Sequence, residues 1–373
     1  MKPSRRRSIL DQLGVERVVN ACGPVTALGG AVLDRRVAGA MADASRTNVR
    51  MEELLAAAGR RIAGLLGAEA AMVTSGSACG LVLAAAACMT GQDRRKAHRL
   101  PNTQGMKNEV LMFAAQDIVY ARNIPHSGAK LIQIPQRRSL RRAIGAKTAA
   151  FVYFPGVNED RCPSLSDCAR ICHRRGVAAI IDAAAKPPLR ANVRRFMRDG
   201  ADLLLYSGGK AIGGPQPSGI LCGRPDLVAA AVLNGCPHEG IGRPMKVGRE
   251  EVAGLVRALE LFLARDHRAE KRKWRSKLEV IRRALRNVSG VTVKLTPRSH
   301  CGDPLPCLYV RPTGEGVPSA GEICRRLGRP DDRDPAIVVS AVGDEILVWP
   351  SLLQTGDERI IARRLKATLS PGA

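Results

Sequence analysis

The sequence predicts an α/β protein with a mainly parallel sheet, helices on both faces of that sheet, and a smaller α+β portion at the C-terminus. Three observations support this class. Short apolar runs alternate with helical patterns over the first two thirds of the 373 residues. Several of these runs are apolar at consecutive positions, which is typical of strands buried on both faces. The length suits one large and one smaller domain better than a single module.

The large domain begins with elements that precede the sheet. Residues 1–20 form an expected arm, and a glycine-rich segment follows at 23–30. A helical pattern runs from Met51 to Leu66 and ends at Gly67, a residue type that often terminates helices. Seven strands are then predicted, with a buried helix at 78–89 after the first of them: 71–73, 109–113, 130–134, 149–154, 178–182, 202–206 and 219–222. Strands that alternate with helices favour a parallel sheet.

The C-terminal third predicts a different arrangement. A long helical region from Arg249 to about Asn287 would join the large domain to a small one. Four strands at 291–293, 307–310, 336–339 and 345–348 and a closing helix near 357–369 predict the α+β portion. The expected domains are therefore an arm at 1–20, a large domain at 21–255, and a linking helix with a small domain at 256–373.

Composition limits the classes of function. The formal net charge of +25 favours anionic partners, whereas aromatic residues make up only 3% of the chain and offer few surfaces for stacking bases. Nucleic acid, tRNA included, is thus a possible partner but not the favoured one. Charged Asp11 follows Ile9-Leu10 at once, so no signal peptide is predicted and a cytoplasmic location is expected.

Neither a membrane span nor a metal site is expected. The uncharged stretch 70–92 is interrupted by polar residues, and its apolar part, 78–89, is about half the length that crosses a bilayer. The chain has eleven cysteines, and because no export signal is predicted, we expect them to be buried apolar residues or free thiols. Cys162, Cys168, Cys172 and His173 lie close in sequence but lack the paired C-x-x-C spacing of zinc sites.

Three groups of polar residues follow predicted strands. Thr74-Ser75-Gly76-Ser77 precedes the buried helix, where hydroxyls and backbone N–H groups could hold a phosphate or simply cap the helix. Asp182 ends a buried strand, where a carboxylate needs a cation, such as a pyridinium or an arginine, or several donors.

Lys210 lies in the segment SGGKAIGG after the strand at 202–206, where desolvation would favour the neutral amine that a Schiff base requires. The alternative is a loop lysine in solvent. The glycine pairs around it would let another molecule approach the backbone closely. A P-loop is excluded, because Leu204 replaces its first glycine and Ala211 replaces its Ser or Thr.

The three groups together match what pyridoxal 5'-phosphate requires of a protein. They provide a phosphate cradle, a partner for the ring nitrogen and an amine for the aldehyde. Ser207, three residues before Lys210, adds a further candidate ligand for the phosphate. The combination carries more weight than any one of the groups.

Longer segments resemble a known family. DLLLYSGGKAIGGPQPSGILCGR at 202–224 looks like the lysine motif of fold-type I pyridoxal-phosphate enzymes related to selenocysteine synthase. The likeness extends to RVVNACGPVTALGG at 17–30, LPNTQGMKNEV at 100–110, IIDAAA at 180–185 and IGRPMKVGREEVAGLVRALE at 241–260. The chain is more similar to the D-glucosaminate-6-phosphate ammonia-lyase branch, because RVVNACG begins at residue 17 and leaves no room for the tRNA-binding domain of selenocysteine synthase.

The resemblance implies roles for particular residues. Lys210 would form the Schiff base, Asp182 would pair with the pyridinium, and Ser75, Gly76, Ser77 and Ser207 would lie near the phosphate. Gln116 would also lie at the cofactor, since Ala115-Gln116 stands where relatives of the lyase branch show a Gly-His pair whose histidine covers the ring. Lys186 likewise replaces an acidic residue common in the family. Arg243 and Lys246 are candidate ligands for an anionic substrate or for a neighbouring subunit's site.

The expected protein is a homo-oligomer built from dimers that acts on a small anionic amino acid or amino sugar acid. Elimination at the α and β carbons is the favoured reaction. Seryl-tRNA selenium transfer, racemase or aldolase chemistry, and a non-catalytic role are the alternatives.

Overall fold

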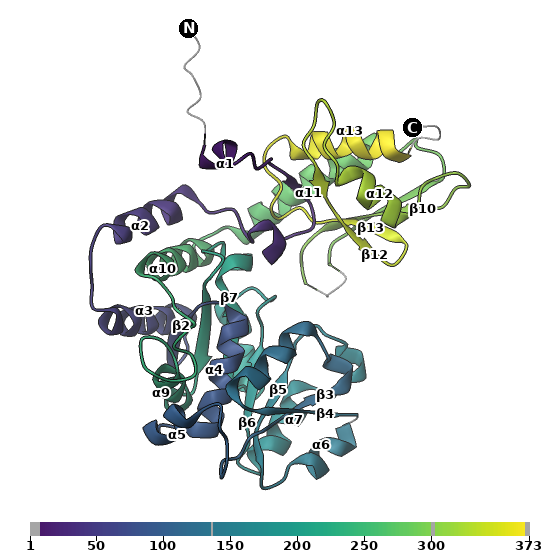
Figure 1. The fold of residues 1–373 in the computed structure, drawn as a ribbon. Helices are drawn as coiled ribbons and strands as arrows, with labels where there is room; N and C mark the ends of the chain where they lie inside the picture. Colours follow the sequence, from purple (N-terminus) through teal and green to yellow (C-terminus); the bar gives the residue numbers. More distant parts are fainter. Residues whose placement is uncertain (1–7, 136, 300–302, 370–373) are drawn as a thin grey trace. The chain divides into compact units, whose positions relative to one another are not determined.

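The computed structural model describes residues 8–135, 137–299 and 303–369 (Figure 1). The chain divides into two compact units, Gly29–Arg265 and a second unit that combines the residues up to Leu28 with those from Asp266 onward. These divisions differ from the expected boundaries at residues 20 and 255. The N-terminal segment belongs to the second unit because its strand β1 (Val19–Asn20) pairs in parallel with β11 (Ile337–Val338). The two strands are more than 300 positions apart, so no short stretch of sequence indicates that they pair.

The large unit is built on a seven-stranded sheet, as predicted. Its spatial order is β2 (Ala70–Thr74), β8 (Gly219–Gly223), β7 (Leu203–Ser207), β6 (Ala178–Asp182), β5 (Thr148–Tyr153), β3 (Glu109–Phe113) and β4 (Lys130–Ile134). Only β8 runs against its neighbours, so the other six strands share one direction. Their carboxyl ends therefore lie along the same edge of the sheet.

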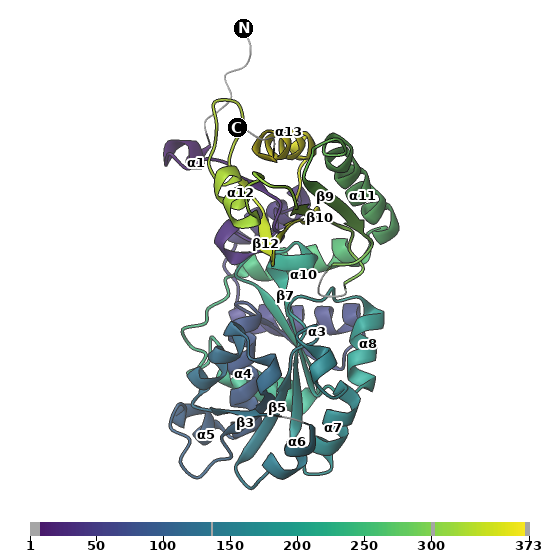
Figure 2. The ribbon, with the colours of Figure 1, turned by 90° about the vertical axis from the view of Figure 1, so that its right-hand side faces the viewer.

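Helices cover both faces of this sheet, because the strands bury apolar side chains on each face. One face packs against α3 (Met51–Leu66), α6 (Arg137–Ala143), α7 (Leu165–His173), α8 (Arg190–Arg198) and α10 (Arg249–Leu263). The other packs against α4 (Ser77–Thr90), α9 (Pro225–Asn234) and the 3-10 helix η3 (Val119–Ser127). Figure 2 shows α4 and α8 on opposite sides of the sheet. The remaining elements are α2 (Arg35–Ser45), α5 (Arg94–Arg99), the 3-10 helices η2 (Ala114–Gln116) and η4 (Glu159–Arg161), and the π-type turn η5 (Gly208–Ile212).

The smaller unit contains an antiparallel sheet in the order β12 (Ser340–Val342), β13 (Glu345–Val348), β10 (Cys307–Pro312) and β9 (Val291–Thr296). Its helices are α1 (Ile9–Gln12), α11 (His267–Ala284), α12 (Ala320–Leu327) and α13 (Asp357–Leu369), with a 3-10 turn η1 (Thr26–Leu28). The long helical region expected from Arg249 to about Asn287 consists of two helices, α10 and α11. Asp266 caps α11 by accepting hydrogen bonds from the backbone N–H groups of Arg268 and Ala269, both at 2.9 Å.

Three further features concern the described residues alone. No helix among them combines the length and apolarity that crossing a membrane requires. Their cysteines are free thiols. No group of three or more His, Cys, Asp or Glu side chains in these ranges is arranged to hold a metal ion.

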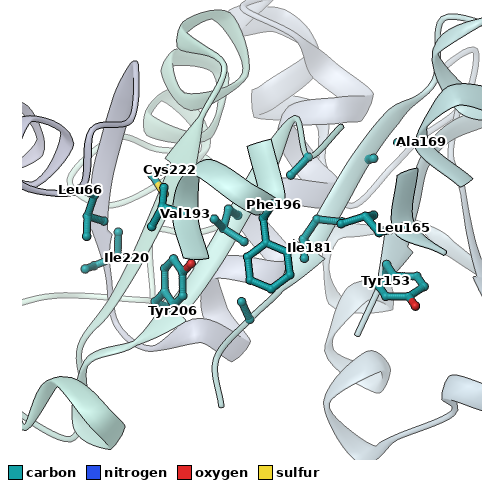
Figure 3. Close-up of a cluster of buried hydrophobic side chains, with 14 of the residues drawn as sticks. Leu66, Tyr153, Leu165, Ala169, Ile181, Val193, Phe196, Tyr206, Ile220 and Cys222 are labelled. Carbon is teal, nitrogen blue, oxygen red and sulfur yellow. The ribbon is translucent and has the colours of Figure 1, made fainter. Parts of the chain in front are cut away.

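Tyr206, on β7, is fully buried in the core between the sheet and α8 (Figure 3). Its hydroxyl has no hydrogen-bond partner among the described residues. Burial without a partner costs free energy, so we expect Tyr206→Phe to leave the free energy of unfolding unchanged or to raise it by up to about 1 kcal/mol. Tyr206→Ala leaves a cavity and should lower it by about 3–5 kcal/mol. Urea denaturation measures both values, and a loss of more than about 1 kcal/mol in Tyr206→Phe would show that the hydroxyl has a partner.

Candidate active site

The candidate site lies where the parallel strands β6 and β7 end. Asp182 is the last residue of β6 and pairs in register with Leu205, and Lys210 follows the end of β7 by three residues. Asp182 is only 9% exposed, and its Oδ1 accepts a hydrogen bond of 2.9 Å from the backbone N–H of Ala184. Lys210 is half-buried. Asp182 and Lys210, which the sequence placed on separate strand ends, are thus brought to neighbouring positions.

Electrostatics links these two side chains. Burial raises the pKa of Asp182 to about 6, against the opposing effects of the Ala184 N–H and the charge of Lys210. Burial also lowers the pKa of Lys210, and the charge of Asp182 opposes this change. Each group therefore lies in the other's field inside a poorly solvated region. An amine with a lowered pKa reacts more readily with an aldehyde, and a buried carboxylate attracts a further cation such as a pyridinium.

The glycines around Lys210 have a different role from the expected one. A Cβ built on Gly208 would lie 2.0 Å from Ser218 Oγ, and one built on Gly209 would lie 2.8 Å from Gln216 Oε1. Atoms of this chain, rather than another molecule, occupy the space beside these glycines. The glycines allow η5 to pack closely against the loop that leads into β8, and this packing holds the Lys210 backbone in place.

A phosphate could bind at the N-terminus of α4. Gly76 is the N-cap residue of this helix, with φ 119° and ψ 161°, a conformation open to glycine alone, and no side chain of a described residue forms a capping hydrogen bond there. Ser75 Oγ is buried and has no hydrogen-bond partner among the described residues. A free helix N-terminus beside a buried hydroxyl without a partner suits an anion. The residues present therefore fit the phosphate of pyridoxal phosphate.

Strand register places this helix N-terminus near Ser207. Thr74, at the end of β2, and Ser207, at the end of β7, both pair with Gly219 on the strand between them. Two strand spacings separate β2 from β7, or about 10 Å. The predicted phosphate ligands Ser75, Gly76, Ser77 and Ser207 thus lie at the same sheet edge as Asp182 and Lys210.

Ser75→Ala tests this cradle. We expect about 10- to 100-fold weaker binding of pyridoxal phosphate, because a hydrogen bond to a charged group is lost. The unfolding midpoint of the cofactor-free chain should not fall, since Ser75 Oγ has no hydrogen-bond partner in the part of the chain that the structure describes. Fluorescence titration gives the affinity, with Ser276→Ala on α11 as a matched control. Equal affinity in Ser75→Ala and the unmodified chain would remove Ser75 from the phosphate site.

Gln116 has a structural role that the sequence did not indicate. Its side chain is fully buried, and its Nε2 donates to the backbone oxygens of Phe154 at 2.9 Å and Val157 at 3.1 Å. Its Oε1 accepts from the N–H of Phe154 at 3.2 Å. The amide joins η2 to the segment after β5, and both of its N–H donors are used. These contacts explain why a polar side chain is buried there, and they argue against the expected role of Gln116 as a cofactor ligand.

Arg243 and Lys246 are exposed in the loop between α9 and α10. The Arg243 side chain contacts Cys236, with 3.9 Å between Nη1 and Sγ. Within the described ranges, no hydrogen bond or ion pair connects either residue to Asp182 or Lys210. Their role as anion ligands stays a prediction.

Tyr120 is a residue that sequence reasoning missed. The Nζ atom of Lys210 lies 5.5 Å from the centre of the Tyr120 ring. The two residues are 90 positions apart. The only local hint was an aromatic residue soon after the end of β3 in a chain with few aromatics.

A mainly parallel sheet that carries a lysine and an aspartate on neighbouring strand ends, beside an uncapped helix N-terminus, defines a pyridoxal-phosphate enzyme of fold type I. No protein-family model matches the sequence. D-glucosaminate-6-phosphate ammonia lyase from Salmonella typhimurium is 31% identical over 76% of this chain and 77% of the relative. A solved structure of D-glucosaminate-6-phosphate ammonia-lyase aligns with 99% of this chain and 98% of its own, with 27% identity and a TM-score of 0.83.

Two other relatives have names that indicate different activities. 5'-C-glycyluridine monooxygenase-decarboxylase from Streptomyces is 37% identical over 68% of this chain. This chain spans only 64% of the length of that relative. L-seryl-tRNA(Sec) selenium transferase from Solidesulfovibrio magneticus is 25% identical over 95% of this chain and 82% of the relative. The chain belongs to the family of pyridoxal-phosphate enzymes that includes D-glucosaminate-6-phosphate ammonia lyase.

Proposed function

We propose that this enzyme is a pyridoxal-phosphate-dependent lyase that acts on an anionic amino acid or amino sugar acid. The observation that carries the proposal is that a buried carboxylate at the end of β6 and a half-buried amine just after the end of β7 lie in each other's electrostatic field. The 31% identity to an ammonia lyase supports the reaction class. The formal net charge of +25 suits an anionic substrate.

Each residue of the site has a defined task in such a reaction. The cofactor, when bound, supplies an electron sink for the bond broken at the α carbon. Lys210 would hold the cofactor through its amine, and the same amine would take the α-proton of the substrate as general base. Asp182 keeps the proton on the ring nitrogen. Ser75, Ser77, Ser207 and the free N–H groups of α4 hold the phosphate.

The overall reaction balances as an elimination followed by hydrolysis. The Cα–H bond breaks, the substituent on the β carbon leaves with its bonding electrons, and the released enamine is hydrolysed. For a β-hydroxy substrate, the water lost in the first stage is regained in the second. The products are a 2-keto-3-deoxy acid and ammonia.

Substrate recognition and assembly belong to the same proposal. Arg243 and Lys246 would bind the anionic group of the substrate, either in their own subunit or in a neighbouring subunit of a homo-oligomer. The domain role expected from the sequence also carries over: the unit at Gly29–Arg265 would hold the cofactor. A cytoplasmic location stays part of this proposal.

A second candidate is oxidative decarboxylation of an amino acid, which the 37% identity to a monooxygenase-decarboxylase favours. The same lysine and aspartate would serve this chemistry, but O₂ would be consumed and CO₂ released. Selenium transfer to seryl-tRNA is the third, and the net positive charge suits it.

Product analysis on the holoenzyme separates these candidates. We expect ammonia and a keto acid in equal amounts from D-glucosaminate 6-phosphate or a related anionic amino acid, without O₂ uptake. Uptake of O₂ with release of CO₂ from 5'-C-glycyluridine would replace the lyase with the second candidate. Salt-sensitive binding of seryl-tRNA, lost as ionic strength rises, would favour the third. If no amino compound changed the visible absorbance of the bound cofactor, the protein would be a non-catalytic member.

A further inference from the structure

Tyr120 lies beside the amine that defines the site, although nothing in its sequence surroundings assigns it a role. It follows β3 on the 3-10 helix η3, and its ring centre is 5.5 Å from Lys210 Nζ. A cation at this distance from an aromatic face is attracted by the ring's quadrupole. The ring therefore contributes to the environment of Lys210 as Asp182 does, but without a charge of its own.

The position of Tyr120 is fixed by its helix. Ala121 and Ile124, on the same helix, are fully buried in the apolar cluster shared with α4. The side chain of Asn123 donates a hydrogen bond of 2.8 Å to the backbone oxygen of Tyr120. Tyr120 itself is 46% exposed, so its ring is not part of the packed core. A substitution there should change the surroundings of Lys210 without threatening the fold.

The other groups around Lys210 do not provide an aromatic contact to its amine. Asp182 is the charged side chain whose field raises the pKa of Lys210. Helix α10 packs against η5, and its charged residues are Arg249, Glu250, Glu251, Arg257 and Glu260. Arg249 pairs with Glu250, and Arg257 pairs with Glu260. Gln116, from η2, is held by the backbone of Phe154 and Val157.

We infer that Tyr120 is a positioning residue for Lys210: its ring holds the ammonium form of the amine and supplies an aromatic surface 5.5 Å from the atom to which the cofactor would be attached. The part of this inference that concerns the cofactor rests on the proposed function, whereas the part that concerns the ammonium form of Lys210 does not. The contact with the ring favours the charged amine, whereas burial favours the neutral one. Tyr120 therefore helps to set the pH at which Lys210 becomes reactive.

Two substitutions distinguish the effect of the aromatic ring on Lys210 from the effect of side-chain size. Tyr120→Phe keeps the aromatic face, and Tyr120→Leu replaces it with an apolar side chain. The pKa of Lys210 is measured in the full-length chain freed of cofactor, by competitive acylation over a range of pH and mass spectrometry of the Lys210 peptide, with exposed Lys130 as internal reference. We expect Tyr120→Leu to lower the pKa of Lys210 by about half a unit and Tyr120→Phe to leave it in place.

A second readout uses the holoenzyme. Loss of the ring should speed the dissociation of pyridoxal phosphate by about three- to tenfold in Tyr120→Leu but not in Tyr120→Phe. If both substitutions changed the pKa of Lys210 alike, or if neither did, the inference would be overturned whatever reaction the enzyme catalyses. Conversely, a failure to find lyase activity would leave the acylation result standing, so the two ideas fail separately.

Discussion

Lys210→Ala is expected to lower turnover by at least about 10³-fold, because the chain loses both the amine that holds the cofactor and the general base. The substitution should also prevent sodium borohydride from fixing the cofactor to the chain. Turnover is measured with saturating cofactor, and fixation is measured by the mass of the Lys210 peptide after reduction.

The control for this variant is Lys130→Ala, on β4, which removes an exposed lysine away from the site. Its activity and borohydride labelling should equal those of the unmodified enzyme. Both variants should keep the circular dichroism of the folded chain. Labelling of a different lysine in the unmodified enzyme would remove Lys210 from the proposed role, and the identification of the site would fail with it.

Asp182→Asn is expected to produce opposite effects on activity and stability. Activity should fall by about 10²- to 10³-fold, since an uncharged amide no longer stabilises the protonated ring nitrogen and the cofactor becomes a weaker electron sink. The cofactor-free chain should become more stable at pH 7 by about 1–3 kcal/mol. Its buried carboxylate is costly to ionise, because its pKa rises from 3.8 to about 6 on folding, and each pH unit of that rise corresponds to about 1.4 kcal/mol.

The pH dependence of this effect has a definite sign. Between pH 3.8 and about 6 the folded chain binds a proton at Asp182 that the unfolded chain has already released. The contribution of this group to stability is therefore fully present below pH 3.8 and is lost as the pH rises through about 6. Urea titrations of the cofactor-free chain at several pH values should show this loss in the unmodified protein and not in Asp182→Asn. Parallel curves for the two proteins would contradict the assigned environment of Asp182.

Much of the site could be predicted because its residues lie in short motifs. Asp182 and Lys210 each follow a continuous apolar run, and such runs are the clearest sign of buried parallel strands. The carboxyl ends of such strands share an edge of the sheet, and both side chains lie at that edge. Local sequence was enough to predict the positions of Asp182 and Lys210, because each position is set by the strand that ends at or just before the residue.

The polar and aromatic surroundings could not be read in this way. Gln116 looked like a cofactor ligand because it replaces a residue of the relatives, yet its amide binds the backbone near β5, about 40 positions later in the chain. The glycines beside Lys210 looked like space for a ligand, yet Ser218 and Gln216 occupy that space. Both outcomes depend on which backbone segments pack together, and composition carries no record of that packing.

By itself, the sequence predicted a mainly parallel sheet and the apolar strands that build it, and it singled out the lysine, the aspartate and the serines at the strand ends as candidates. Each of these follows from hydrophobic periodicity and from residue chemistry within about ten positions. Only the tertiary structure decided that β1 joins β11, that Ser75 Oγ is buried without a partner among the described residues, and that Tyr120 lies beside Lys210. These contacts arise when the chain closes long loops around a common core, and the packing of that core, rather than local preference, fixes which side chains meet.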